Sequence, residues 1–137
     1  MSKLQDKSEL NFSSARLLHD KNFYPPVAHC SYYGCFQLIK HVWLNSFKKT
    51  DDDLKALIDS LKKGKANQTG SHEVLINQIS TYIKSKKEVD YRDFNSSILQ
   101  LKKLRTTSDY DDVDFDCTKS SKCLQLSEII RPILKKY

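Results

Sequence analysis

Glycine and proline are scarce in this sequence, with three of each in 137 residues. These two residues mark turns, so their scarcity disfavours a fold of many short strands and favours long helices. The sequence also lacks an apolar run long enough to span a bilayer. Its first residues, MSKLQDKSEL, lack the apolar centre of a signal peptide. We therefore expect one all-α domain over residues 1–137, located in the cytoplasm and without membrane contact.

The four cysteines do not form a recognisable metal or disulfide pattern. Cys30 and Cys35 are five residues apart on a predicted helix, which turns their side chains about 140° away from each other. Cys117 and Cys123 are six residues apart, a spacing that fits no common ligand pair of a structural zinc site. We expect reduced thiols, no metal and no cofactor.

The net charge of +6 is unevenly distributed, because five of the 17 acidic residues lie in segment 109–116. A basic body with an acidic loop can attract nucleic acid or an acidic partner, although lysines that solvate helix faces explain the same charge. The acidic segment lacks the central glycine and the final glutamate of a calcium-binding loop. Solvation, shielding of the basic body and docking to a basic partner remain open for it.

Apolar periodicity and capping residues predict six helices. They run from about Ser2 to Lys21, from the prolines 25–26 to about Phe47, from Thr50 or Asp51 to Gly64, from Ser71 into segment 84–88, from Asp90 to about Thr107, and from Asp116 or Thr118 through Pro132, which should kink or shorten the last turn. The second helix is apolar on most sides, which is typical of a central, buried helix. Gly34 within it lowers helix propensity and indicates that a neighbouring helix approaches closely.

Short connections between these helices predict an antiparallel up-and-down bundle, with four or five of about six helices in the core. We expect helices two, four, five and six to form the core and the third to be a shorter satellite. The first helix carries a ragged apolar side made of Leu4, Leu10, Ala15, Leu17 and Leu18.

Three stretches together carry a resemblance to a known family. They are ARLLHDKNFYPPVAHCSYYGCFQLIKHV (15–42), TGSHEVLINQI (69–79) and LKKLRTTSDYDDVDFDCTKSSKCLQLSEIIRPILKKY (101–137). The first resembles the Ala and Leu helix, aromatic hinge and Tyr-Tyr-small pattern of the HEPN superfamily, the helical-bundle domains of prokaryotic toxin–antitoxin and defence systems. The second resembles the surroundings of a helix-opening His in one bacterial branch. The third resembles the Leu, Arg and Asp-Tyr of that branch, followed by a last amphipathic helix.

The resemblance implies a HEPN-like regulatory or binding module. Such a module would act with a partner such as a small nucleotidyltransferase, or would bind nucleotide or RNA without catalysis. The resemblance also implies a homodimer, which the wide apolar circumference of the second helix favours as well. A gene for a nucleotidyltransferase next to the gene for this chain would favour the regulatory role.

The alternative is a metal-independent endoribonuclease toxin with a degenerate active site. HEPN ribonucleases carry an Arg followed after four to six residues by a His, near a helix end at a dimer interface. Here Arg105 is followed by TTSDYD without a His, and His19 follows Arg16 too closely. Metal-free RNA cleavage needs a group that moves the 2′-OH proton near neutral pH, which His does best. We therefore expect little or no ribonuclease activity unless folding brings a His from elsewhere.

Four residues are the candidates for such a site: His72, Arg105, Asp109 and Tyr110. Arg105 can hold a phosphate, Asp109 needs a raised pKa to act as a base, and Tyr110 can donate to an oxyanion. His72 is the best candidate for the missing His, because a positive helix end lowers its pKa and favours the neutral form.

Structural roles explain the same four residues more simply: a local cap or a hydrogen bond to the loop for His72, a helix-end pair of Arg105 with Asp109, and a Tyr110 ring packed over the bundle end. If the last three act as a unit, Arg105 and Asp109 should be close enough for a charge-assisted hydrogen bond, and Tyr110 should lie against a neighbouring helix. The other histidines have simpler expected roles: a core hydrogen bond for His29, a helix end for His41 and an exposed position for His19.

Overall fold

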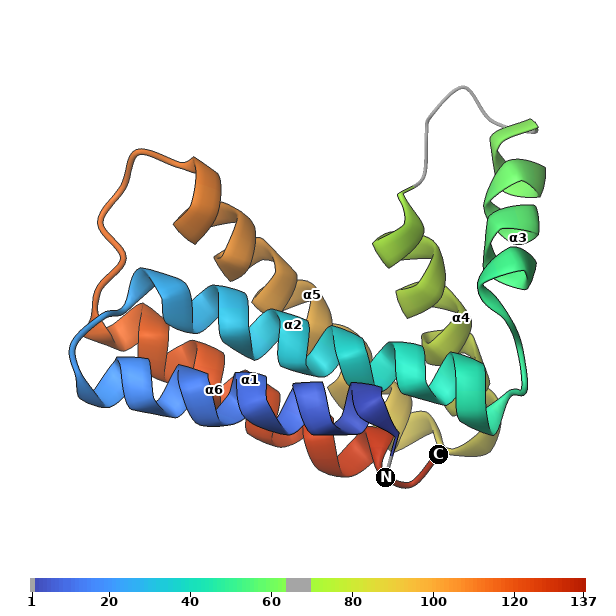
Figure 1. The fold of residues 1–137 in the computed structure, drawn as a ribbon, viewed down its shortest axis with the longest axis horizontal. Helices are drawn as coiled ribbons and strands as arrows, with labels where there is room; N and C mark the ends of the chain where they lie inside the picture. Colours follow the sequence, from blue (N-terminus) through green and yellow to red (C-terminus); the bar gives the residue numbers. More distant parts are fainter. Residues whose placement is uncertain (1, 64–69) are drawn as a thin grey trace.

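Six α-helices and one π-helical turn make up the fold, in which the computed structural model describes residues 2–63 and 70–137. The elements are α1 (Lys3–Asp20), α2 (Pro25–His41), the π-helical turn η1 (Val42–Ser46), α3 (Asp51–Lys63), α4 (Ser71–Lys86), α5 (Glu88–Tyr110) and α6 (Cys117–Leu134) (Figure 1). No strand occurs in either described range. The predicted all-α bundle is therefore confirmed.

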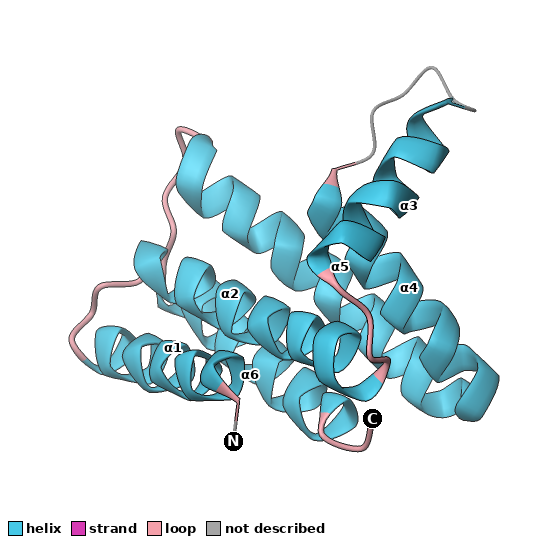
Figure 2. Ribbon diagram, turned by 45° about the vertical axis from the view of Figure 1, so that its right-hand side comes forward, coloured by secondary structure: helices cyan, strands magenta, loops and turns pink. Residues whose placement is uncertain are grey.

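Helix α2 is the centre of the bundle, because it packs against α1, α4, α5 and α6. Figures 1 and 2 show α1, α2 and α6 lying side by side, with α4 and α5 leaning away from them. Helix α3 contacts α4 and is the expected satellite. One expectation was wrong: α1 belongs to the core, and its interface with α2 is the most extensive in the bundle.

The α1–α2 interface depends on a close contact at Gly34. A Cβ atom added there would lie 2.7 Å from the Phe12 ring, so only glycine leaves room for this aromatic side chain. Ser8 Oγ, which is fully buried, donates a hydrogen bond to the Gly34 carbonyl at 2.7 Å. The predicted close approach at Gly34 is confirmed. The expected apolar side of α1 was partly wrong, since Leu10 and Leu17 are exposed and Phe12 enters the core.

Capping side chains begin three of the helices. The Ser2 hydroxyl accepts from Gln5 N–H, the Thr50 hydroxyl accepts from Asp53 N–H at 3.0 Å, and the Asp116 carboxylate accepts from Lys119 N–H at 3.0 Å. Thr50 and Asp116 were each one of two predicted caps, and these contacts decide between them. The predicted end of α3 at Gly64 lies outside the described residues.

Both predicted boundaries of α5 were wrong, whereas the second helix ends near Phe47 as expected but with an irregular last turn. Helix α2 passes into a π-helical turn at Val42 instead of continuing regularly to Phe47, and α5 begins at Glu88 and ends at Tyr110 instead of about Thr107. Ser108 Oγ donates to the Pro25 carbonyl at 2.7 Å, so a contact with α2 holds the added turn of α5. As a result, Asp109 and Tyr110 are helical residues and the acidic loop is shorter.

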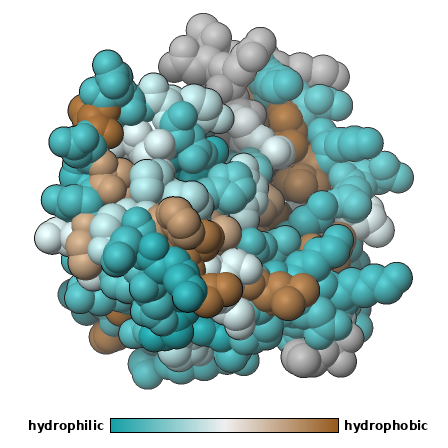
Figure 3. All heavy atoms as spheres, turned by 60° about the vertical axis from the view of Figure 1, so that its left-hand side comes forward, coloured by the Kyte–Doolittle hydropathy of each residue, from teal (hydrophilic) through white to brown (hydrophobic). Residues whose placement is uncertain are grey.

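The surface is mostly hydrophilic, and Figure 3 shows hydrophobic residues only in small separate patches on the face where α1, α5 and α6 have their left-hand ends in Figure 1. No described helix combines the length and hydrophobicity that a membrane span requires. All four cysteines are unpaired, with Cys35 and Cys123 buried.

The apolar residues of α2 pack within the chain, so α2 gives no support to the expected homodimer, which stays a prediction.

Replacing Gly34 with Ala should destabilise the protein by about 1–3 kcal/mol, because the added methyl group collides with the Phe12 ring. In an open helix position the same change would stabilise by up to about 1 kcal/mol. The free energy of unfolding from urea denaturation measures the effect.

A double-mutant cycle with Phe12→Leu identifies the cause. The cost of Gly34→Ala should shrink in the Phe12→Leu background, since the smaller side chain leaves room for the methyl group. Equal costs in both backgrounds would contradict the steric explanation.

Candidate functional site

Polar and aromatic side chains from three helices converge around Arg105, at the end of the bundle where α4 begins. We name this group the Arg105 cluster. Its members are His29, Tyr32, Tyr33 and Phe36 on α2, His72 on α4, and Arg105 and Asp109 on α5.

Helical spacing explains how each element contributes to the cluster. Positions 29, 32, 33 and 36 of α2 are separated by three or four residues, which places their side chains along one face. Arg105 and Asp109 are four residues apart on α5 and form a neighbouring pair. His72 is the second residue of α4, so it lies at the positive end of that helix.

Arg105 is partly buried, and its guanidinium makes no short hydrogen bond among the described residues. Its side chain is only 14% exposed, and its guanidinium carbon lies 5.1 Å from the centre of the Tyr32 ring and 5.6 Å from that of Tyr33. Its Nε atom is buried without a partner among the described residues. A buried donor left unsatisfied costs about 1–3 kcal/mol, so this arrangement needs an explanation.

Asp109 lies between Arg105 and His29. Its Oδ2 atom is 3.5 Å from Arg105 Nη1 and 3.6 Å from His29 Nδ1, and 27% of its side chain is exposed. Both separations exceed the usual hydrogen-bond range of about 2.7–3.2 Å. Asp109 therefore balances the charge of Arg105 without satisfying its donors by a short hydrogen bond.

His72 is held by two residues of α2. Its ring stacks on Phe36 with 3.8 Å between the ring centres, and its Nδ1 atom lies 3.0 Å from the Tyr32 hydroxyl. Burial raises the pKa of Tyr32 to about 12, so this hydroxyl stays protonated and can donate to a neutral imidazole.

The pKa of His72 is lowered by burial first, and then by the charges of Arg105 and Lys102. The predicted direction is therefore confirmed, although burial is the largest cause. Because the pKa is lower in the folded chain, the neutral ring stabilises the fold above about pH 6.5. This stabilisation is lost as the pH falls through the pKa of the folded state.

The structure brings together three of the four predicted site residues. His72, Arg105 and Asp109 lie in one cluster, and the Arg105–Asp109 separation of 3.5 Å is longer than the expected charge-assisted hydrogen bond. Tyr110 is 73% exposed, so the expectation that it packs against a neighbouring helix was wrong. Because α5 continues to Tyr110, the Tyr110 ring faces solvent and does not pack over the end of the bundle.

Two other histidines also differ from expectation. His29 is exposed and lies against Tyr33 with the two rings tilted and 4.5 Å between their centres, instead of making a core hydrogen bond. His19 is partly buried and lies 2.7 Å from the hydroxyl of the buried Ser120, instead of being free in solvent. His41 ends α2 as predicted.

Sequence reasoning missed that His29 and three aromatic residues of α2 belong to the site. The four-residue spacing of His29 and Tyr33 could be read from the sequence. The approach of Asp109 to His29 could not, because it depends on the added turn of α5. Within residues 2–63 and 70–137, no three His, Cys, Asp or Glu side chains gather closely enough to hold a metal ion. The cluster instead offers a partly satisfied cation, two imidazoles and aromatic faces.

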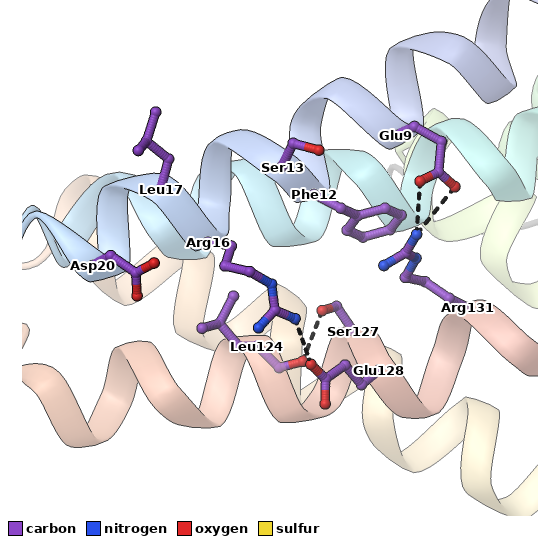
Figure 4. A pocket seen from close by; sticks show the side chains of 10 residues that line it. All are labelled: Glu9, Phe12, Ser13, Arg16, Leu17, Asp20, Leu124, Ser127, Glu128 and Arg131. Atoms are coloured by element: carbon purple, nitrogen blue, oxygen red, sulfur yellow. Dashed lines mark hydrogen bonds and ion pairs between the residues drawn. The ribbon is translucent and has the colours of Figure 1, made fainter.

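A hollow of about 340 Å³ lies between α1 and α6, away from the Arg105 cluster (Figure 4). Two arginines of this hollow make short contacts: Arg131 Nη2 donates to both carboxylate oxygens of Glu9 at 3.0 and 2.9 Å, and Arg16 pairs with Glu128 at 2.7 Å. The Nε atom of Arg131 is buried without a partner among the described residues, as is that of Arg105. This contrast favours the Arg105 cluster as the candidate site, because Arg105 makes no comparable short contact.

No family model, curated protein or solved structure matches the chain. The resemblance to the HEPN superfamily therefore stays a prediction.

We expect His72 to titrate below the usual histidine pKa of about 6.5 and its pKa to rise in Arg105→Gln, because that variant removes a nearby positive charge. Proton NMR of the imidazole signals across pH 4.5–8.5 measures both values.

Arg92→Gln is the matched control, since it removes the same charge from an exposed position near the other end of α5. Equal His72 pKa values in wild type and Arg105→Gln would contradict the effect of the Arg105 charge on His72.

Proposed function

We propose that the Arg105 cluster binds a phosphate group of a nucleotide or an RNA chain. The observation that carries this proposal is the guanidinium of Arg105, which packs on two tyrosine rings and makes no short hydrogen bond among the described residues, with Asp109 Oδ2 at 3.5 Å from its Nη1. Phosphate oxygens are strong acceptors that match the planar donor face of arginine. Binding an anion would satisfy a donor that the ligand-free fold leaves unsatisfied.

Nearby groups favour a negatively charged ligand. Lys102 lies one turn before Arg105 on α5, and its charge acts on His72. The first turn of α4 follows Gly70, which has no side chain to cap the free backbone N–H groups of that turn. Helix N-termini attract anions through these N–H groups.

The aromatic rings of the cluster suit a nucleotide better than a free phosphate ion. Tyr33 and Phe36 are partly exposed, and His29 is exposed beside Tyr33. Aromatic and imidazole rings stack with unpaired bases in single-stranded RNA. A regulatory role with a nucleotidyltransferase, in a homodimer of a toxin–antitoxin or defence system, stays a prediction from the HEPN resemblance.

Metal-independent RNA cleavage is the second candidate function. The proximity of His29 and His72 to Arg105 favours it, because it answers the absence of a His downstream of Arg105. One imidazole would remove the 2′-OH proton while O2′ attacks the phosphorus, and the other would protonate the leaving O5′. Asp109 beside His29 Nδ1 would orient that ring, and Arg105 would hold the phosphate.

Arg105→Gln should weaken binding of a fluorescein-labelled single-stranded RNA 12-mer about tenfold or more. Loss of a charged hydrogen bond costs about 1.5–3 kcal/mol, which corresponds to that change in dissociation constant. Fluorescence anisotropy at constant salt measures the binding, and a thermal melt measures the fold.

Arg92→Gln again provides the control, since it changes the net charge equally and should weaken binding only slightly. If both variants weaken RNA binding equally, the binding depends on general charge attraction and not on a site at Arg105. A large loss of stability in Arg105→Gln with unchanged binding would make Arg105 a structural residue and would contradict the proposal.

If the second candidate function is correct, the wild type should cleave single-stranded RNA in the presence of EDTA and leave 2′,3′-cyclic phosphate ends. His29→Gln, His72→Gln and Arg105→Gln should each lower the rate at least about 100-fold, because each removes a proton-transfer or phosphate-binding group. Gel electrophoresis and mass spectrometry of the products measure this. RNA that stays intact with wild type, or cleavage unchanged in all three variants, would exclude this function.

A further inference from the structure

We propose that Asp109 makes the site specific for a phosphate diester, which carries one negative charge, over a terminal phosphate monoester, which carries nearly two. The proposal rests on phosphate binding at Arg105 and goes further by naming the charge class of the ligand. The proposal depends on the position of the Asp109 carboxylate, which lies beside the Arg105 guanidinium that would bind the phosphate.

The position of Asp109 is fixed by the fold. It lies one helical turn after Arg105 on α5, and Ser108 beside it is hydrogen-bonded to the Pro25 carbonyl at 2.7 Å. Its carboxylate is 3.5 Å from Arg105 Nη1 and 3.6 Å from His29 Nδ1. A phosphate bound by Arg105 would therefore lie beside a negative charge that cannot move far away.

The charges around the cluster leave little capacity for a dianion. Arg105 and Asp109 cancel each other at close range, and burial lowers the pKa of His72 so that its ring is neutral near pH 7.5. Lys102 is the remaining cation that acts on His72. A phosphate monoester carries about −1.5 to −2 charges at neutral pH, so its second charge meets Asp109 without a matching cation.

A purely structural role of Asp109 makes a different prediction. If the carboxylate only stabilises the end of α5, removing it changes the binding of monoesters and diesters by the same factor. If it repels ligand charge, the monoester gains more than the diester, because repulsion grows with the charge of the ligand. A matched pair of ligands that differ by one methyl group separates these two roles.

The probes are adenosine 5′-monophosphate and its methyl phosphate ester, titrated into wild type, Asp109→Asn and the control Asp93→Asn at pH 7.5 and low salt. Asp93 is exposed near the opposite end of α5, so its replacement removes the same charge far from the cluster. Calorimetry or chemical-shift changes of the His72 ring measure the dissociation constants.

We expect wild type to bind the methyl ester at least as tightly as the monoester. Asp109→Asn should strengthen monoester binding about tenfold more than diester binding, whereas Asp93→Asn should change both equally. Monoester binding that appears only in Asp109→Asn would also support the proposal.

A wild type that prefers the monoester, with a ratio that Asp109→Asn leaves unchanged, would overturn the specificity while phosphate binding at Arg105 survives. Failure of both probes to bind wild type and Asp109→Asn, together with RNA binding that does not depend on Arg105, would overturn the proposed function and this inference with it.

Discussion

The packing of Arg105 on Tyr32 and Tyr33 joins the core of the bundle to its candidate site. Tyr32 is fully buried in the central helix α2, and its hydroxyl also contacts His72 at the start of α4. A cation over two aromatic rings is attracted by their electron-rich faces, which offsets part of its lost hydration. In this position Arg105 Nη1 lies 3.5 Å from Asp109 Oδ2, and the Nε donor is buried without a partner among the described residues.

The α1–α6 hollow contains an arginine that makes short hydrogen bonds, although its Nε atom, like that of Arg105, is buried without a partner among the described residues. Arg131 also packs on an aromatic ring, with its guanidinium carbon 4.0 Å from the centre of the Phe12 ring, but Glu9 accepts two short hydrogen bonds from it. Arg105 has only the longer contact with Asp109. The difference in partners, at similar aromatic packing, separates an arginine that closes a helix interface from one that is available to a ligand.

The sequence predicted the helices and the close contact at Gly34 because periodicity, caps and glycine act locally. It could not predict that α1 belongs to the core, since Phe12 stands among polar neighbours and its burial depends on the space that Gly34 leaves. The site was predicted in part: His72, Arg105 and Asp109 were candidates, but the role of His29 was wrong. The last turn of α5 is hydrogen-bonded through Ser108 to the start of α2, and Asp109 in that turn lies 3.6 Å from His29. Such long-range contacts leave no local pattern in the sequence.

The most direct measurement is an NMR spectrum of the arginine side-chain Nε–Hε groups in the wild type, recorded with and without a single-stranded RNA oligonucleotide. Binding at the cluster predicts that the Arg105 signal moves, because a phosphate held by the Nη groups changes the surroundings of the adjoining Nε–Hε group. The signals of Arg92 and Arg131 should stay in place. An Arg105 signal that does not change while the RNA is bound would contradict the account.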